Sequence, residues 1–181
     1  MQARSERARL AVPVGERDHV VGPGVSAEVT LVEYGDFECP YTRRARPVVR
    51  RLRQELGDRL LFAFRNFPLS RIHPHAQAAA EAAEAATSQG RYWEMHDILF
   101  DNQRHLEDED LRRYAQELGL DLNRFERELT QHAPARRVCE DLKGGLKSGV
   151  RGTPTFFVNG LRHDGPNDLA ALWAAVAQAA R

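Results

Sequence analysis

The feature that most constrains the fold is a strand followed closely by a helix near residue 40. An apolar run at residues 29–34 with few polar members predicts a central strand covered on both faces. The run ends at Gly35, and the segment after Cys39 and Pro40 has helical character. A proline is tolerated in the first turn of a helix, where its missing N–H costs nothing. The pattern therefore predicts that Cys39 lies at or just before a helix N-terminus.

This position provides an environment suited to a thiolate at Cys39. The unpaired N–H groups and the positive dipole end of a helix N-terminus stabilise an anion. Two acidic residues, Asp36 and Glu38, flank the cysteine and oppose this effect if their carboxylates lie close to it. The residue three positions after Cys39 is Thr42, so the site has one thiol where a Cys-x-x-Cys redox motif has two.

The middle of the chain is predicted to be entirely helical. A helix over 42–57, which Pro47 should kink, leads to a strand over 60–69. In the segment after this strand, a face with Gln77, Glu81, Glu84 and Ser88 is expected to be solvated. Five helical segments follow one another without a strand, at residues 74–88, 92–100, 107–118, 123–129 and 134–147.

The last part of the chain returns to strands. A strand over 155–158, the turn signal Asn159-Gly160 and a short strand over 161–163 predict a hairpin, and a capped helix follows. The order of elements predicts an α/β fold with an inserted all-helical subdomain. We expect a flexible N-terminal tail, a domain in two pieces and a helical insertion, at residues 1–18, 19–69 with 151–181, and 70–150 respectively.

Charge and hydropathy exclude several classes of protein. The 181 residues include 26 basic and 26 acidic side chains, a balance that does not favour nucleic acid or an anionic membrane as a partner. No segment approaches the roughly 18 apolar residues of a membrane span. The N-terminal residues lack the apolar stretch of a signal peptide, so a cytoplasmic location is expected. Oligomeric state is left open.

The cysteines and histidines limit which disulfides and metal sites the chain can form. With only Cys39 and Cys139, a secreted disulfide scaffold is excluded. Cys139 is expected to pack in a helix interface, with a role as a second reacting thiol as the alternative. His73 and His75 lack further ligands at metal-binding spacing, so a turn and helix-start role is expected and no metal.

Four segments, in this order, carry a family resemblance: VEYGDFECPYT, HPHAQAAAEAAEAA, YWEMHDILF and GVRGTPTFFVNG. With them, the chain resembles the DsbA-like thiol-disulfide oxidoreductases, which have a thioredoxin fold with a helical insertion. The resemblance implies that Cys39 is the nucleophile and that Pro154 is the cis-proline packed beside it. Thr153 would present its backbone to an extended substrate, and Pro40 and Tyr41 would also contact substrate.

The resemblance also implies roles for Glu33 and Thr42. Glu33 falls where the family keeps a buried acid, and burial should raise its pKa into the range of a proton acceptor at neutral pH. Thr42 replaces the second cysteine; its hydroxyl could donate to the Cys39 thiolate but cannot resolve a mixed disulfide. The implied chemistry is therefore monothiol, with protein disulfides or glutathione as partners and an external thiol such as glutathione as co-substrate, without a bound cofactor.

Other interpretations stay open at this point. Arg43 and Arg44 could attract an anionic thiol, or simply form a solvated helix face. The chain could be a peptide-binding module that has lost turnover. It could also be a glutathione-dependent transferase or isomerase, because kappa-class glutathione transferases and hydroxychromene-carboxylate isomerases share the fold without the cysteine pair.

Overall fold

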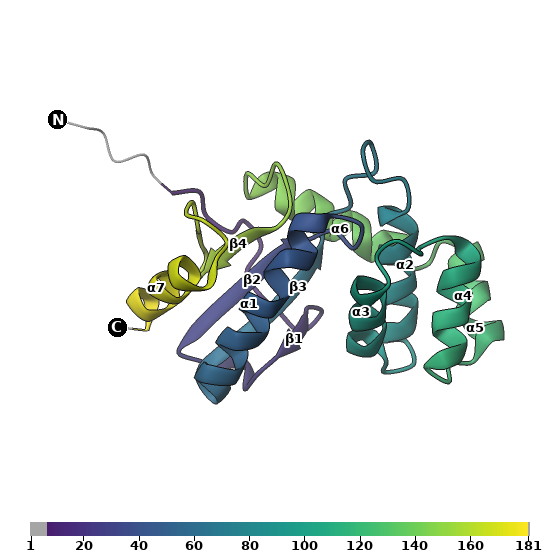
Figure 1. Cartoon of the computed structure of the whole chain (residues 1–181), viewed down its shortest axis with the longest axis horizontal. Helices are drawn as coiled ribbons and strands as arrows, with labels where there is room; N and C mark the ends of the chain where they lie inside the picture. Colours follow the sequence, from purple (N-terminus) through teal and green to yellow (C-terminus); the bar gives the residue numbers. More distant parts are fainter. Residues whose placement is uncertain (1–6, 181) are drawn as a thin grey trace. The chain divides into compact units, whose positions relative to one another are not determined.

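The computed structural model describes residues 7–180 and contains a five-stranded sheet whose strands differ in length (Figure 1). β2 and β4 are antiparallel neighbours, as are β1 and β3, and β4 and β5. All of β3 and all but one residue of β2 are buried, which confirms for β2 the prediction of a covered central strand. The order across the sheet is β1 (His19–Val21), β3 (Leu60–Asn66), β2 (Val29–Gly35), β4 (Thr155–Val158) and β5 (Leu161–Arg162).

Seven α-helices accompany the sheet in the described residues. α1 begins at Pro40 and continues through Pro47, and the next five helices follow without an intervening strand, as predicted. Short 3-10 helices occupy Gly24–Ser26 and Gly57–Arg59. The α-helices are α1 (Pro40–Leu56), α2 (Ala76–Thr87), α3 (Tyr92–Asp101), α4 (Asp108–Glu117), α5 (Leu122–Thr130), α6 (Ala135–Lys147) and α7 (Leu169–Ala179).

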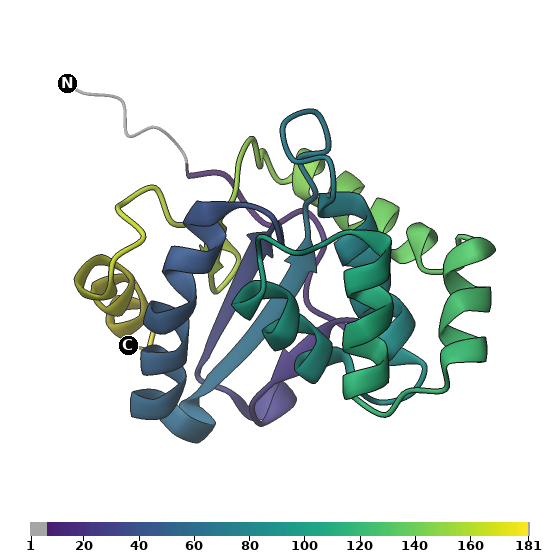
Figure 2. The same ribbon diagram turned by 45° about the vertical axis from the view of Figure 1, so that its right-hand side comes forward.

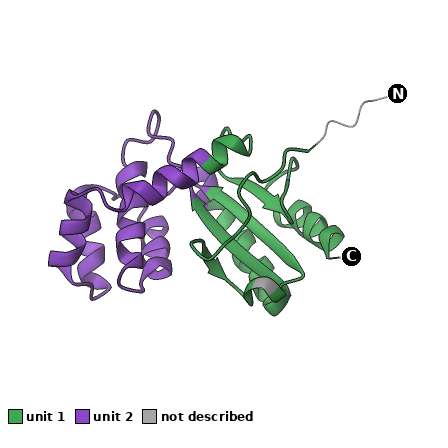
Figure 3. Cartoon of the chain, turned by 180° about the vertical axis from the view of Figure 1, so that it is seen from behind, with its two compact units in different colours: residues 1–34, 44–65, 144–181 green, residues 35–43, 66–143 purple. Residues whose placement is uncertain are grey.

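The chain divides into two compact units (Figure 3). The first contains most of the sheet, residues 44–56 of α1, the end of α6 and α7; α1 and α7 lie side by side in Figure 1 and in Figure 2. The second contains residues 35–43 and 66–143, which include α2 to α5 and most of α6.

These units differ from the predicted insertion at 70–150 in three places, one of which is that the second segment of the helical unit begins at residue 66 and not at 70. Residues 35–43, the turn that carries Cys39, belong to the helical unit. Residues 144–150 belong to the unit with the sheet, because a Cβ at Gly144 would lie 3.3 Å from the Tyr34 hydroxyl and the Ser148 hydroxyl accepts a hydrogen bond from the Ala11 amide.

Residues 7–18, which belong to the predicted tail, are hydrogen-bonded to other parts of the first unit. Arg9 forms an antiparallel bridge with Leu161, and the Leu10 amide donates to the Gly160 carbonyl. The Arg65 guanidinium bonds both carboxylate oxygens of Asp18, at 2.8 and 2.9 Å. Residues 1–6 of the predicted tail lie outside the described residues.

The Arg65 guanidinium is a buried centre of hydrogen bonding in this unit. It also donates to the carbonyls of Val12 and Pro13 and to the Tyr34 hydroxyl. Burial acts to lower the pKa of Arg65, but its bonds and charge interactions with Asp18 and Tyr34 leave that pKa above its ordinary value. Nothing in the local pattern of the sequence indicates this cluster, because Asp18 and Arg65 lie far apart along the chain.

The predicted solvated face of α2 is wrong in its centre. Glu81 and Glu84 are each only 8% exposed, because α2 packs against α3, α4 and α5. Both carboxylates accept side-chain hydrogen bonds instead, Glu81 from Gln77 and Glu84 from Asn66, each at 2.7 Å. A buried carboxylate needs such partners, since an unpaired one is costly.

Candidate active site

Cys39 lies directly before α1, as the sequence predicts. The Arg43 amide donates to the Cys39 carbonyl at 3.2 Å, the first hydrogen bond of the helix, and the Cys39 amide donates to the Asp36 carbonyl at 3.1 Å. The residue is 3% exposed. The turn over residues 36–39, here called the cysteine turn, therefore presents a buried thiol at the N-terminal end of a 17-residue helix.

The two acidic side chains of the cysteine turn bind residues 69–75. The buried Asp36 carboxylate accepts the Glu38 amide on Oδ1, and on Oδ2 it accepts the Leu69 amide and contacts Nδ1 of His73, all at 2.8 Å. The Glu38 carboxylate accepts the His75 amide at 2.7 Å. These contacts give His73 and His75 specific positions in the turn before α2, and the pairing of His73 with Asp36 had no signal in the sequence.

Gln103 fixes the cysteine turn from another side. Its Nε2 donates to the carbonyls of Phe37 and Cys39, at 2.8 and 2.9 Å. Phe37 also packs against the rings of Phe100 and His96, with centroids 4.9 and 5.7 Å away. His96 is thus part of the aromatic packing beside the cysteine turn.

Thr42 and the exposed residues beside it differ in their surroundings. Thr42 is fully buried, and its hydroxyl accepts the Asp36 amide at 3.4 Å. The donation of this hydroxyl to the Cys39 sulfur stays a prediction. Pro40 is exposed and Tyr41 is 63% exposed, so both are open to contact with a partner molecule.

Glu33 lies in the first unit, on β2 opposite Phe156. It is 2% exposed, and among the described residues its Oε1 has no hydrogen-bond partner. Burial raises the pKa of Glu33 to about 8, with the charge of Arg46 acting in the opposite direction. The predicted buried acid with a raised pKa is thereby confirmed, and at neutral pH the group mostly holds its proton.

Thr153 and Pro154 lie in the same unit, immediately before β4. The peptide bond between them is cis, and both residues are half-buried. The hydroxyl of the next residue, Thr155, donates to the Gly152 carbonyl at 2.7 Å and closes a short turn around them.

Cys139 does not pack in the interior as predicted. It is exposed on α6 while Val138 is 1% exposed, because successive residues of a helix point in directions about 100° apart. Neither Cys39 nor Cys139 forms a disulfide in the part of the chain that the structure describes.

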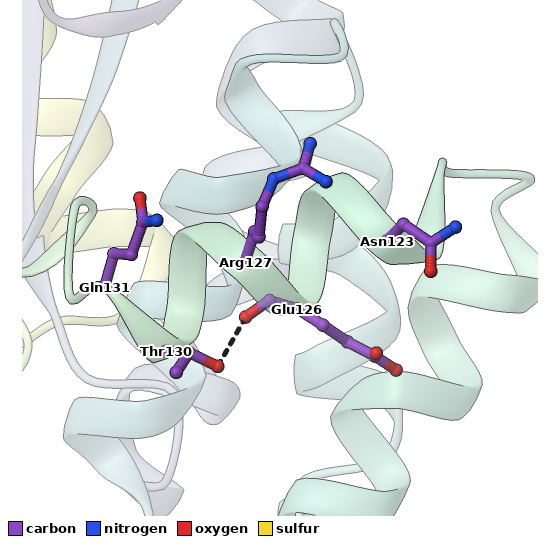
Figure 4. Close-up of a pocket in the computed structure, with 5 residues that line it drawn as sticks. All are labelled: Asn123, Glu126, Arg127, Thr130 and Gln131. Atoms are coloured by element: carbon purple, nitrogen blue, oxygen red, sulfur yellow. Dashed lines mark hydrogen bonds between the residues drawn. The ribbon is translucent and has the colours of Figure 1, made fainter.

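Each unit has a cavity that is lined by residues other than the predicted site residues. One of about 440 Å³ runs along α5, lined by five polar side chains (Figure 4), where the Thr130 hydroxyl donates to the Glu126 carbonyl at 2.8 Å. Another of about 590 Å³ is lined by residues including Leu10, Val20 and Asn159.

The described residues provide neither a group of three metal ligands nor a helix suited to a membrane span. Within residues 7–180, no three His, Cys, Asp or Glu side chains are grouped so that they could bind a metal ion. In the same part of the chain, no helix has both the length and the apolar character needed to cross a bilayer.

Known structures with this fold are numerous. BdbD from Bacillus subtilis superposes with a TM-score of 0.81 at 21% identity, covering 97% of this chain and 99% of that one. Wolbachia pipientis alpha-DsbA1 gives 0.77 at 19% identity, with 94% of each chain covered. A thioredoxin-like oxidoreductase from Silicibacter pomeroyi gives 0.79 at 28% identity, covering 91% of this chain and 93% of that one. The fold is therefore the thioredoxin-like fold of DsbA-type proteins.

The relatives and the family model that match the sequence identify the family to which the chain belongs. The curated relative from Salinispora arenicola, named Na(+)/H(+) antiporter NhaA 1, is 52% identical over 171 residues, which are 94% of this chain. The chain spans about a quarter of the length of the curated relatives it matches (26% for this one). A family model described as thioredoxin matches residues 16–178, and on that match over nine-tenths of its length the chain belongs to the thioredoxin family.

Proposed function

We propose that the chain is a monothiol thiol-disulfide oxidoreductase. The Cys39 thiolate attacks one sulfur of a substrate disulfide, a mixed disulfide forms, and the second substrate sulfur leaves as a thiolate that takes up a proton. An external thiolate then attacks the mixed disulfide and releases Cys39. With one external thiol the result is an exchange, in which one substrate sulfur leaves as a thiol and the other ends in a disulfide with the external thiol. A second external thiol reduces that disulfide, so two thiols supply the two electrons for each substrate disulfide and are themselves oxidised to a disulfide.

The placement of Cys39 directly before α1 carries this proposal. A sulfur at a helix N-terminus faces the orphan N–H groups and the positive end of the helix dipole, which favour the attacking thiolate. The hydrogen bonds of Asp36 and Gln103 hold the cysteine turn in this geometry. A rigid turn also supports a reproducible approach of the substrate disulfide.

Thr42 makes the external thiol necessary. A hydroxyl cannot displace a thiolate from a mixed disulfide, so resolution falls to a thiol from solution, for which we propose glutathione. In this scheme Glu33 accepts or returns a proton, while Thr153 and Pro154, with Pro40 and Tyr41, contact the substrate chain. The chemistry needs no bound cofactor.

The first experiment is mass spectrometry after incubation with oxidised glutathione. Because Cys139 is exposed, it can react nonspecifically, so Cys139→Ser is the parent protein and Cys139→Ser/Cys39→Ser the matched control. We expect a single glutathione adduct on Cys39 that added reduced glutathione removes. An adduct confined to Cys139 in the wild type, with an inert Cys39, contradicts the proposal.

A second experiment restores the missing thiol. Thr42→Cys replaces a fully buried residue by one of similar volume and should yield a dithiol that reduces insulin disulfides. Thr42→Ser is the control, because it is equally small and keeps a hydroxyl. Failure of a folded Thr42→Cys protein to gain activity would mean that more than one substitution separates the site from dithiol chemistry.

A second candidate function rests on the names of the curated relatives. Proteins 45–52% identical to this chain are called Na(+)/H(+) antiporters, and the chain matches about a quarter of each. We propose as the alternative that the chain acts as an accessory thiol domain of such a transporter. Mixed disulfides that form on Cys39 in the cells that produce the protein would identify the partner. An antiporter polypeptide in these disulfides favours the accessory-domain alternative. Other disulfide-containing proteins favour the oxidoreductase proposal.

A further inference from the structure

The pair of Asp36 and His73 is the best-defined group of charged side chains at the cysteine turn. Nδ1 of His73 lies 2.8 Å from Asp36 Oδ2, with the His73 side chain 16% exposed and the Asp36 side chain fully buried. Asp36 is joined to Cys39 and to Thr42 as well, through its backbone carbonyl and amide. A charge on His73 is therefore in direct contact with Asp36, whose backbone groups are hydrogen-bonded to Cys39 and Thr42.

The buried carboxylate has an electrostatic consequence for the thiol. Asp36 is three residues before Cys39 and its charge disfavours a second anion nearby. Three donors satisfy its oxygens, but only His73 can add a full positive charge. When the imidazole is protonated, the pair has no net charge; when it is neutral, the carboxylate charge is uncompensated.

Resting on the proposed function, we propose that His73 is a positioning residue that compensates the charge of Asp36 and so favours the Cys39 thiolate. Protonated His73 lowers the electrostatic cost of forming the thiolate. A variant that lacks the imidazole leaves the Asp36 charge without compensation and should react more slowly at Cys39.

Other charged groups lie on the segments bonded to the cysteine turn, and all of them except His75 in the control variant are kept constant in the test. Glu38 is engaged by the His75 amide, a backbone contact. These segments are residues 36–43, 66–75 and 101–105. Their remaining titratable or charged side chains are Tyr41, Arg43, Arg71, His75, Asp101, Arg104 and His105.

The experiment measures the rate of alkylation of Cys39 by iodoacetamide against pH. The reagent is uncharged, so a change of protein charge alters the thiolate fraction and not the attraction of the reagent. The parent is Cys139→Ser, and the series is repeated with Glu33→Gln so that the titration of Glu33 does not enter. The variants are His73→Gln, Asp36→Asn and the double variant, with His75→Gln as the matched control.

His73→Gln should slow alkylation about three- to tenfold near pH 6, as expected for loss of one nearby charge in a partly screened site. The double variant should recover most of the parent rate, because no carboxylate charge is left to compensate. His75→Gln should match the parent, since its amide contact is retained.

The opposite result is equally clear. If His73 only holds the loop, the double variant reacts no faster than His73→Gln, and the shape of the pH profile is the same in both. Circular dichroism of each variant establishes that it is folded. If Cys39 in the parent is not alkylated at any pH, the proposed function is wrong. If Cys39 is alkylated but His73→Gln has the same alkylation rate as the parent at every pH, only this inference is wrong.

Discussion

Glu33 is a carboxylic acid inside a sheet, and its cost to the fold depends on pH. Its pKa of about 8 lies above the ordinary value of 4.5 because burial disfavours the charged form. The stability that the protonated form contributes is fully present below pH 4.5. It is lost as pH rises through about 8, where the folded protein must accept a buried charge.

Replacing this carboxyl group by an amide should remove the pH dependence. Glu33→Gln should gain about 4 kcal/mol in unfolding free energy relative to wild type between about pH 5 and pH 9, with wild type and variant similar at the acid end. Urea unfolding of both proteins across this range gives the measurement. A difference that does not change with pH would show that Glu33 is solvated or paired in the folded protein.

The elements at the site depend on side chains that bond backbone groups far away in sequence. The cysteine turn is bonded by Gln103, which follows α3, and by the segment before α2 through Asp36 and Glu38. When such a side chain is truncated, the backbone groups that it bonded lose their hydrogen-bond partner, which costs free energy where those groups are buried.

Gln103→Ala should therefore destabilise the protein by about 1–3 kcal/mol, since it deprives two backbone carbonyls of their donor. Chemical unfolding gives the free energy, and amide hydrogen exchange should show faster opening at residues 37–43. Gln116→Ala, at an exposed position on α4, is the control and should change little. Equal stability of the two variants would mean that Gln103 is dispensable to the turn.

Periodicity and turn residues predicted most elements, because those signals are local. The helix start at Pro40, the strand-free run of helices and the hairpin at Asn159-Gly160 all follow from neighbouring residues. The predicted strand over 60–69 ends early, at Asn66, and the Leu69 amide bonds the Asp36 carboxylate. The pairs Asp36–His73, Asn66–Glu84 and Asp18–Arg65 join residues distant in sequence, and no periodic pattern encodes them.

At the scale of the whole molecule, the unit with the sheet depends on one buried cation. Arg65 joins residues 12–18 to the interior through Asp18 and two backbone carbonyls, with side chains of Arg65 and Asp18 only 3% and 6% exposed. Removing one partner of a buried ion pair leaves the other charge without compensation.

Arg65→Met should lower the unfolding free energy by about 3–5 kcal/mol, because the Asp18 carboxylate loses both of its guanidinium bonds. Arg112→Met is the control: its ion pair with Glu126 is on the surface and should contribute less than about 1 kcal/mol. Urea unfolding of the two variants gives the comparison. Similar losses in both would mean that the buried pair contributes no more than a surface pair.

The bridge between Arg9 and Leu161 affects whether a chain shortened at its N-terminus aggregates. Residues 8–10 hydrogen-bond along β5, the last strand of the sheet, and cover polar backbone groups that would otherwise be open. An uncovered sheet edge is a template for pairing with a second chain. A shortened chain that starts at residue 16, where the family match begins, would lack this cover and should aggregate through β5 at concentrations at which the full chain stays in solution.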